Sequence, residues 1–94
     1  LVTDGAAAIV MTRADRARDM VARPAFLLGA GEATTHRDIG SMQDLTVTAA
    51  VDSGARAYSS AGVKPSDVDV VELYDAFTIN TILFLEEASN LIFD

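Results

Sequence analysis

The clearest hydrophobic pattern in the chain is a stripe of small and apolar residues with helical spacing. Its positions recur at intervals of three, four and seven residues, which places them on one face of a helix. They are Val47, Ala50, Val51, Gly54, Ala55, Tyr58 and Ala61. Because most of these side chains are small, we expect this helix to approach its neighbour closely.

Local signals set the limits of this helix. Ser41 or Asp44 is able to cap its start, because short polar side chains accept the first free amide protons of a helix. Gly62, with a proline three residues beyond it, is typical of a helix end. On the polar side, Asp52 and Arg56 are four residues apart, which predicts an ion pair.

The first quarter of the chain predicts an apolar run followed by a polar helix. Residues 6–11 are apolar and end in β-branched residues, so alone they fit a buried strand or the start of a helix. Thr12 and Asp15 then have the spacing of a helix cap and an acidic first turn. The pattern therefore favours a strand over 6–11 and a short helix over 12–20.

Two further apolar runs, 25–28 and 68–73, predict strands, and an apolar helix follows the second of them. Asp75 stands where it is able to cap this helix, which we expect over 76–87. Its apolar residues point nearly all round: Phe77, Ile79, Ile82, Leu83, Phe84 and Leu85. Such a helix requires cover on most sides, and a chain this small cannot supply it, so other segments or chains must. The alternation of strands and helices places the chain in the α/β class.

Composition narrows the possible functions. The 94 residues carry a net charge of −7, which argues against a nucleic-acid partner held through phosphates. The chain has no cysteine, so disulfides, thiolate zinc sites and a Cys nucleophile are excluded within it. No apolar run approaches the ~20 residues of a membrane span, and no signal peptide is visible, so we expect a soluble, cytoplasmic protein. Since no initiator methionine is present, the chain is expected to begin inside a longer product.

Two local features resemble parts of ligand-binding or metal-binding sites, but each is better explained by an ordinary structural role. The stretch Gly29-Ala30-Gly31 resembles a dinucleotide-binding loop, but Thr34 stands where the third glycine is required, so a tight turn is expected. His36 is the only histidine and lies in a predicted loop. With no cysteine and no second histidine it forms no evident zinc site, so no metal is predicted.

Three stretches in the same order resemble the thiolase superfamily. Residues 4–8, Asp-Gly-Ala-Ala-Ala, are similar to a strand that leads out of the first half of the thiolase fold. The helix that ends at Gly62 and the segment 64–69 resemble a helix, turn and strand of the second half. Residues 70–77 stand where thiolases have a strand that ends in Glu-x-Asn-Glu-Ala-Phe. The resemblance implies part of a layered αβαβα fold, incomplete in this chain, with residues 1–21 ending the N-terminal half and 22–94 starting the C-terminal half.

The departures from the thiolase pattern concern the site residues. Tyr74 replaces the Asn that helps form an oxyanion hole in thiolases, and Asp75 replaces the Glu. The resulting Tyr-Asp-Ala-Phe-Thr sequence is similar to the lipid-transfer-protein branch, related to sterol-carrier-protein thiolases, which includes steroid side-chain retro-aldolases. The Cys nucleophile, the Gly-His-Pro segment, the Cys-Gly-Gly loop and the coenzyme A binding loop of thiolases are not in this sequence. Residues 88–94 do not resemble the family.

The resemblance therefore implies a fragment of an acyl-CoA enzyme that makes or breaks a C–C bond next to a thioester. The parent is then an acetyl-CoA acetyltransferase of the thiolase type, or a retro-aldolase in which Tyr74 is catalytic. Tyr74 is able to act as acid or base, and Asp75 either orients it or only caps a helix. Coenzyme A enters as the thioester substrate, with no covalently bound cofactor. The implied partners are further copies of the protein and a small OB-fold chain that binds acyl-CoA; a non-catalytic chain that binds partners through its apolar helix is the alternative.

Overall fold

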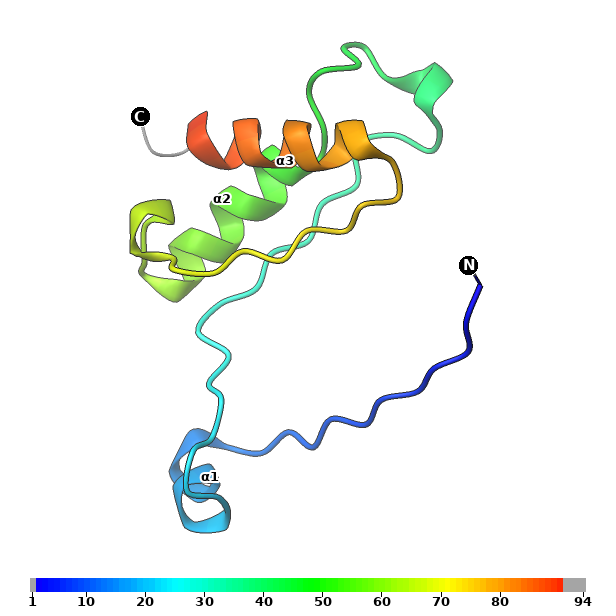
Figure 1. Ribbon diagram of the computed structural model, residues 1–94. Helices are drawn as coiled ribbons and strands as arrows, with labels where there is room; N and C mark the ends of the chain where they lie inside the picture. Colours follow the sequence, from blue (N-terminus) through cyan, green and yellow to red (C-terminus); the bar gives the residue numbers. More distant parts are fainter. Residues whose placement is uncertain (1, 91–94) are drawn as a thin grey trace.

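The computed structural model describes residues 2–90, which form three α-helices and two short 3₁₀ helices joined by irregular segments (Figure 1). The α-helices are α1 (Ala14–Met20), α2 (Ala50–Ala61) and α3 (Thr78–Asn90). The 3₁₀ helices are η1 (Ile39–Ser41) and η2 (Pro65–Asp67). None of the helices within this part of the chain is both long and apolar enough to cross a membrane.

Helix α2 confirms the strongest pattern in the sequence, including its end. Gly62 follows the last helical residue with a φ of 68°, a left-handed conformation that glycine adopts without a steric penalty. Its amide donates to the Tyr58 carbonyl at 2.9 Å. The predicted caps at the other end are wrong, because the helix begins at Ala50 and the Thr48 hydroxyl accepts from the Ala50 amide at 3.0 Å. Ser41 and Asp44 lie too far upstream.

The close neighbour of α2 is the segment that contains Gly29 and Gly31. A Cβ atom on Gly29 would stand 2.5 Å from the Ala57 carbonyl oxygen and 2.6 Å from the Ala61 amide nitrogen. A Cβ atom on Gly31 would collide with the Ser53 carbonyl oxygen. The expected tight turn is therefore wrong. These glycines let an extended backbone lie directly on the helix, which confirms the close approach that the small residues of α2 predict.

Helices α2 and α3 contact each other, and Glu87 joins them (Figure 1). The Glu87 carboxylate accepts hydrogen bonds from the backbone amide and the hydroxyl of Thr48, at the N-terminus of α2. An anionic group is favoured there because the first amide protons of a helix have no partner within the helix.

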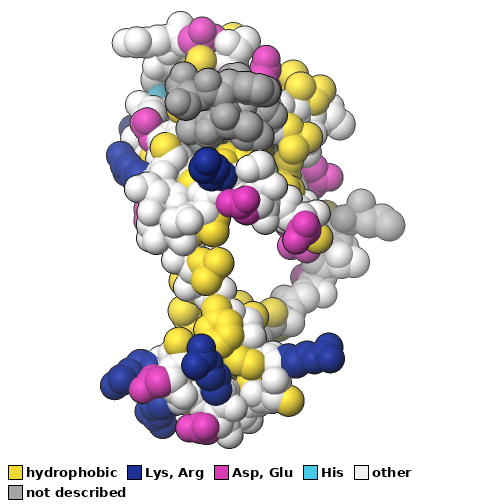
Figure 2. All heavy atoms as spheres, turned by 90° about the vertical axis from the view of Figure 1, so that its left-hand side faces the viewer, with side chains coloured by type: hydrophobic (Ala, Val, Ile, Leu, Met, Phe, Trp, Pro, Cys, Tyr) yellow, Lys and Arg dark blue, Asp and Glu magenta, His cyan; other side chains and the backbone are white. Residues whose placement is uncertain are grey.

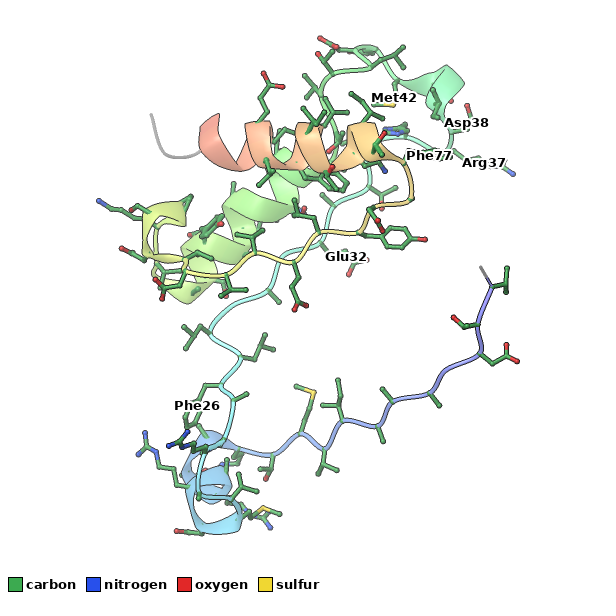
Figure 3. All side chains as sticks on the ribbon, viewed as in Figure 1. Phe26, Glu32, Arg37, Asp38, Met42 and Phe77 are labelled. Atoms are coloured by element: carbon green, nitrogen blue, oxygen red, sulfur yellow. The ribbon has the colours of Figure 1, made fainter. Side chains whose placement is uncertain are left out.

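Helix α1 lies apart from α2 and α3, at the far end of a long irregular segment (Figure 1). The Arg18 guanidinium stands 5.8 Å from the centre of the Phe26 ring, which lies beside α1 (Figure 3). Basic side chains gather around this end of the molecule next to apolar ones (Figure 2). The residue before α1 is Arg13, not Thr12, and it makes no capping bond, so the predicted cap is wrong. Asp15 does lie in the first turn and pairs with Arg13 at 2.8 Å.

The predicted strands are not formed within residues 2–90. Their apolar side chains face solvent: Ile9 is 86% exposed, Leu27 72% and Val70 77%. A strand requires a neighbour to accept and donate its backbone hydrogen bonds, and residues 2–12 and 69–76 make no bonds of this kind. No hydrophobic side chain among those described is buried. The layered α/β arrangement is thus not seen in this part of the chain.

Two further local predictions are corrected. Helix α3 begins at Thr78, so Asp75 stands too early in the chain to cap it. The Arg56 guanidinium does not pair with Asp52 but donates to the Glu32 carbonyl at 2.6 Å. This bond ties α2 to the segment that carries the two glycines.

Asp44 builds the turn that leads into α2. Its carboxylate accepts from the Thr46 amide at 2.8 Å and from the Thr46 hydroxyl at 2.6 Å. These two hydrogen bonds, the hydroxyl first, favour the ionised form and hold the pKa of Asp44 below its ordinary value of 3.8. The turn is an Asx-type turn, in which a short acidic side chain binds backbone two residues ahead.

Replacing Gly29 or Gly31 with Ala is predicted to destabilise the protein by about 1–3 kcal/mol, because the added methyl group forces the segment away from α2. The measurement is chemical unfolding of the complete polypeptide that contains these residues. Gly5→Ala is the control, since a Cβ atom there meets nothing within 4 Å. Equal stabilities for Gly31→Ala and Gly5→Ala would contradict the close approach.

The Asp44 turn is predicted to weaken in acid. Because the pKa is lowered in the folded state, the stabilisation is present above the ordinary value of 3.8 and is lost as pH falls through the folded pKa. An NMR titration should give Asp44 a midpoint below 3.8 that rises in Thr46→Val and stays low in Thr46→Ser. A midpoint that is the same in Thr46→Val as in the unaltered protein would refute the role of the hydroxyl.

Candidate functional site

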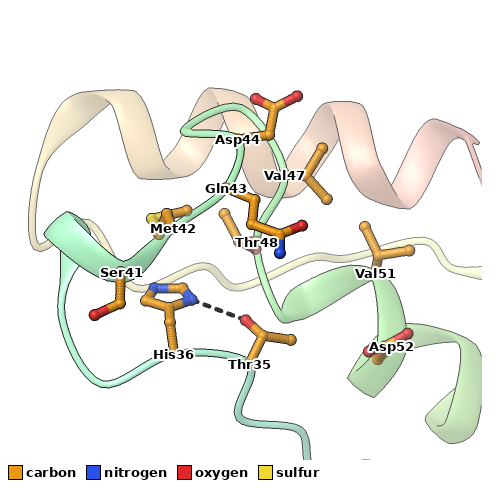
Figure 4. Close-up of a pocket in the computed structure, with 10 residues that line it drawn as sticks. All are labelled: Thr35, His36, Ser41, Met42, Gln43, Asp44, Val47, Thr48, Val51 and Asp52. Atoms are coloured by element: carbon orange, nitrogen blue, oxygen red, sulfur yellow. Dashed lines mark hydrogen bonds between the residues drawn. The ribbon is translucent and has the colours of Figure 1, made fainter.

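A hollow between the loop 35–48 and the first turns of α2 is the larger of the two that flank this helix (Figure 4). Its volume is about 490 Å³, within the range of small-molecule sites. The lining combines polar groups with a few apolar ones: Thr35, His36, Ser41, Met42, Gln43, Asp44, Val47, Thr48, Val51 and Asp52. The Thr48 bonds fasten the end of this loop to α2 and α3, and the turn between Asp44 and Thr46 shapes the loop just before it.

His36 supplies the one imidazole of the hollow, and its ring is half-buried there (Figure 4). Its Nδ1 lies 2.8 Å from the Thr35 hydroxyl oxygen, a distance that suits either tautomer. The hydroxyl fixes the orientation of the ring and leaves Nε2 without a partner among the described residues. The ring is therefore placed to donate to, or accept from, a group in the hollow.

The charges in this hollow are negative. Asp44 and Asp52 contribute two carboxylates, and no lysine or arginine lines the space. A phosphate or carboxylate is disfavoured there by like-charge repulsion. No group of three or more His, Cys, Asp and Glu side chains within the described part of the chain is arranged to hold a metal ion.

A second hollow of about 450 Å³ lies at the other end of α2. It is lined by Ala55, Tyr58, Ser59, Gly62, Val63, Lys64 and Pro65. Its single charge is the cationic Lys64, so the two ends of α2 carry hollows of opposite charge.

The two site residues expected from the sequence lie outside both hollows. Tyr74 and Asp75 belong to the irregular segment that precedes α3, and Tyr74 is 78% exposed. Among the side chains that the structure describes, neither makes a hydrogen bond or an ion pair with another residue. The structure therefore does not bring Tyr74 together with Asp75 or His36, and a catalytic role for either residue stays a prediction.

Sequence reasoning did not anticipate the hollow or the contribution of Glu87. The available signals were weak: polar residues crowd into the loop before α2, and an acidic pair interrupts the apolar pattern of α3. Neither signal says which distant residue would be met. Thr48 and Glu87 are separated by 39 positions, and only the fold brings them into contact.

Comparison with known proteins identifies one matching family and several relatives. The profile of a family described as "Thiolase C-terminal domain-like" matches residues 31–91. An acetyl-CoA acetyltransferase of Methanothermobacter thermautotrophicus is 33% identical over 87 residues, which cover 92% of this chain and 23% of that protein.

Two lyases give similar matches. A 17-hydroxy-3-oxo-4-pregnene-20-carboxyl-CoA lyase of Mycobacterium tuberculosis is 32% identical over 90% of this chain and 23% of that protein. A steroid side-chain-cleaving aldolase of Thermomonospora curvata is 31% identical with the same coverage of both. No solved structure gives a significant match.

The chain thus spans about a quarter of the length of the curated relatives it matches. The family match covers most of this chain and includes α2, α3 and both hollows. By that match, the chain belongs to the thiolase C-terminal domain-like family.

Proposed function

We propose that the chain is part of an enzyme that makes or breaks a C–C bond next to a coenzyme A thioester. The observation that carries this proposal is the family match over 31–91, together with relatives named as acetyl-CoA acetyltransferases and steroid side-chain lyases. These relatives support acyl-CoA as the substrate of the complete enzyme.

The fold in the complete enzyme is proposed to be the layered αβαβα arrangement. The apolar runs 6–11, 25–28 and 68–73 are extended or irregular and expose their side chains, as strands do when their neighbours are missing. Parallel strands are buried on both faces, so such runs gain most from a sheet that other segments complete. This arrangement places Tyr74 directly after the last run, at the carboxyl end of a strand, where α/β proteins hold ligands.

Two chemistries fit the proposal, and retro-aldol cleavage is the one that uses this chain's own residues. Tyr74 has a phenol hydroxyl that is solvent-exposed and has no partner within residues 2–90. In retro-aldol cleavage the substrate hydroxyl loses its proton, the adjacent C–C bond breaks, and its electron pair moves into the thioester enolate, which is then protonated. Tyr74 is suited to donate a hydrogen bond or a proton to that enolate oxygen. Asp75 would orient the phenol or a water molecule.

A thiolase-type acyl transfer instead requires a Cys nucleophile, which this sequence does not contain. In that case another part of the polypeptide supplies the nucleophile, and Tyr74 lines the pocket. The relatives include enzymes of both kinds, acetyl-CoA acetyltransferases as well as a lyase and an aldolase, so the preference for retro-aldol cleavage rests on Tyr74 in place of the thiolase Asn.

Helix α3 supports a contact role in the same enzyme. Ile79 is 53% exposed and Ile82 60%, and Phe77 directly before the helix is 70% exposed, so this end of α3 presents an apolar surface that the described chain does not cover. Burying such a surface is favourable by ~25 cal/mol per Å². The proposed contacts are other segments of the enzyme, a second copy, or a small OB-fold chain that binds acyl-CoA. If the chain has no catalytic role, binding a partner through α3 is the alternative function.

The retro-aldol assignment predicts that Tyr74→Phe lowers kcat for cleavage of a β-hydroxyacyl-CoA by about 10²-fold or more in the complete enzyme. KM should change little, because the ring remains and only the hydroxyl is removed. Asp75→Asn should cause a smaller loss if Asp75 only orients the phenol.

Tyr58→Phe is the matched control, because it removes a phenol hydroxyl from α2, outside the segment that carries Tyr74. Unchanged turnover in Tyr74→Phe would exclude the acid–base role. Loss of turnover in both variants would point to a general effect on the fold.

A further inference from the structure

Glu87 is the one buried residue among those whose side chains are described, with 5% of its surface exposed. Burying an ionised carboxylate is costly unless hydrogen bonds replace its water. Apolar side chains of the same helix are more exposed: Leu85 is 49% exposed and Ile82 60%. A charge in the most enclosed position of this structure therefore requires a specific partner.

That partner is Thr48, and Glu87 binds both of its hydrogen-bond donors. One carboxylate oxygen accepts from the Thr48 backbone amide, and the other accepts from the Thr48 hydroxyl at 2.7 Å. Hydrogen bonds to an ionised acceptor are shorter and about twice as strong as neutral ones. The two bonds together fix the backbone and the side-chain rotamer of Thr48.

The hydrogen bonds of the Thr48 hydroxyl determine what it is able to offer to a ligand. Its proton is donated to Glu87, and one of its lone pairs accepts from the Ala50 amide at 3.0 Å. A hydroxyl has one proton and two lone pairs, so one acceptor position remains. Thr48 lines the larger hollow (Figure 4).

We propose that Glu87 is a positioning residue for the larger hollow. Its carboxylate takes both donors of Thr48 and fixes this residue in the wall as a hydrogen-bond acceptor. The inference concerns the geometry and hydrogen-bond polarity of the hollow and does not depend on which reaction the complete enzyme performs.

The rest of the wall is mixed in hydrogen-bond polarity, since the Gln43 amide and the hydroxyls of the lining are able to donate as well as accept. Asp44 and Asp52 contribute carboxylates, which only accept when they are ionised. Met42, Val47 and Val51 add an apolar surface. A ligand that fits this wall is uncharged or cationic and presents an N–H or O–H group to the Thr48 acceptor beside an apolar portion, whereas the two carboxylates disfavour a phosphate.

A double-mutant cycle in the complete polypeptide tests the coupling between Glu87 and Thr48. We expect Glu87→Gln to raise the unfolding equilibrium constant by a factor that is at least about ten times larger in the unaltered background than in Thr48→Val. The reason is that the hydroxyl bond is already absent in Thr48→Val. Thr48→Ser keeps the hydroxyl and should preserve the coupling. Glu86→Gln is the matched control, since Glu86 is the exposed neighbouring carboxylate of the same helix.

NMR supplies a readout that a general loss of stability does not move. The Thr48 amide proton is expected far downfield in the unaltered protein, with a hydroxyl proton protected from exchange. In Glu87→Gln the amide should shift upfield and the protected hydroxyl signal should disappear, while Glu86→Gln leaves both in place. If Glu87→Gln does not fold, the same signals are compared in Thr48→Ser and in Glu87→Asp, whose shorter side chain cannot bridge both donors.

Additive effects of Glu87→Gln and Thr48→Val would overturn the proposal, as would a Thr48 amide that is unchanged in the folded Glu87 variants. Equal effects of Glu86→Gln and Glu87→Gln would also overturn it. Coupling that survives in Thr48→Ser and vanishes in Thr48→Val, with the shifted amide, is the result expected.

Discussion

The pair formed by Glu87 and Thr48 is the interaction on which the arrangement of α2 and α3 depends. It joins residues 39 positions apart and links the last turns of α3 to the residue that lies two positions before α2. The Thr48 hydroxyl that Glu87 holds in place in turn accepts from the Ala50 amide, one of the first amides of α2, which the Ala49 side chain cannot satisfy. In a chain whose described hydrophobic side chains are all at least partly exposed, directional hydrogen bonds and the backbone contact of Gly31 take over much of the role that a core has elsewhere. The hollow exists because its wall is fastened at these points.

The parts of the fold that the sequence predicted are the parts that local interactions determine. The end of α2 at Gly62 follows from one residue's φ, and the close approach to α2 follows from the size of its side chains. The prediction of strands at 25–28 and 68–73 could not rest on local interactions in the same way, because a strand forms only by hydrogen bonding with another segment. Strand propensity and the alternation of apolar residues show that such a run is able to form a strand. They do not show whether a second strand is present to pair with it. The apolar character of α3 did predict correctly that the chain cannot cover this helix by itself.

The same difference between local interactions and contacts of distant segments applies to the candidate site. The chemistry of Tyr74 was inferred from a motif, and the motif also brought out the family that the comparisons identify. Its geometry was not predictable, since residues 69–76 make no backbone hydrogen bonds with one another or with the helices. The hollow beside His36 escaped prediction for the opposite reason. Its residues are ordinary loop residues in sequence, and only the bonds of Asp44, Thr48 and Glu87 bring them into one wall.

Helix α3 connects the segment that carries Tyr74 to the residue that holds the wall of the hollow. Tyr74 lies four residues before the helix begins, and Glu87 lies near its end, so the helix is a rigid connection between the segment of the proposed catalytic phenol and the wall of the hollow. A helix rises 1.5 Å per residue, and a bond that fixes one end therefore restricts where the other end can lie. In a sheet that other segments complete, the ladder of residues 68–73 would fix the start of α3 while Glu87 fixes its end. The exposed face of α3 would then be the surface available to the remaining segments of the proposed enzyme.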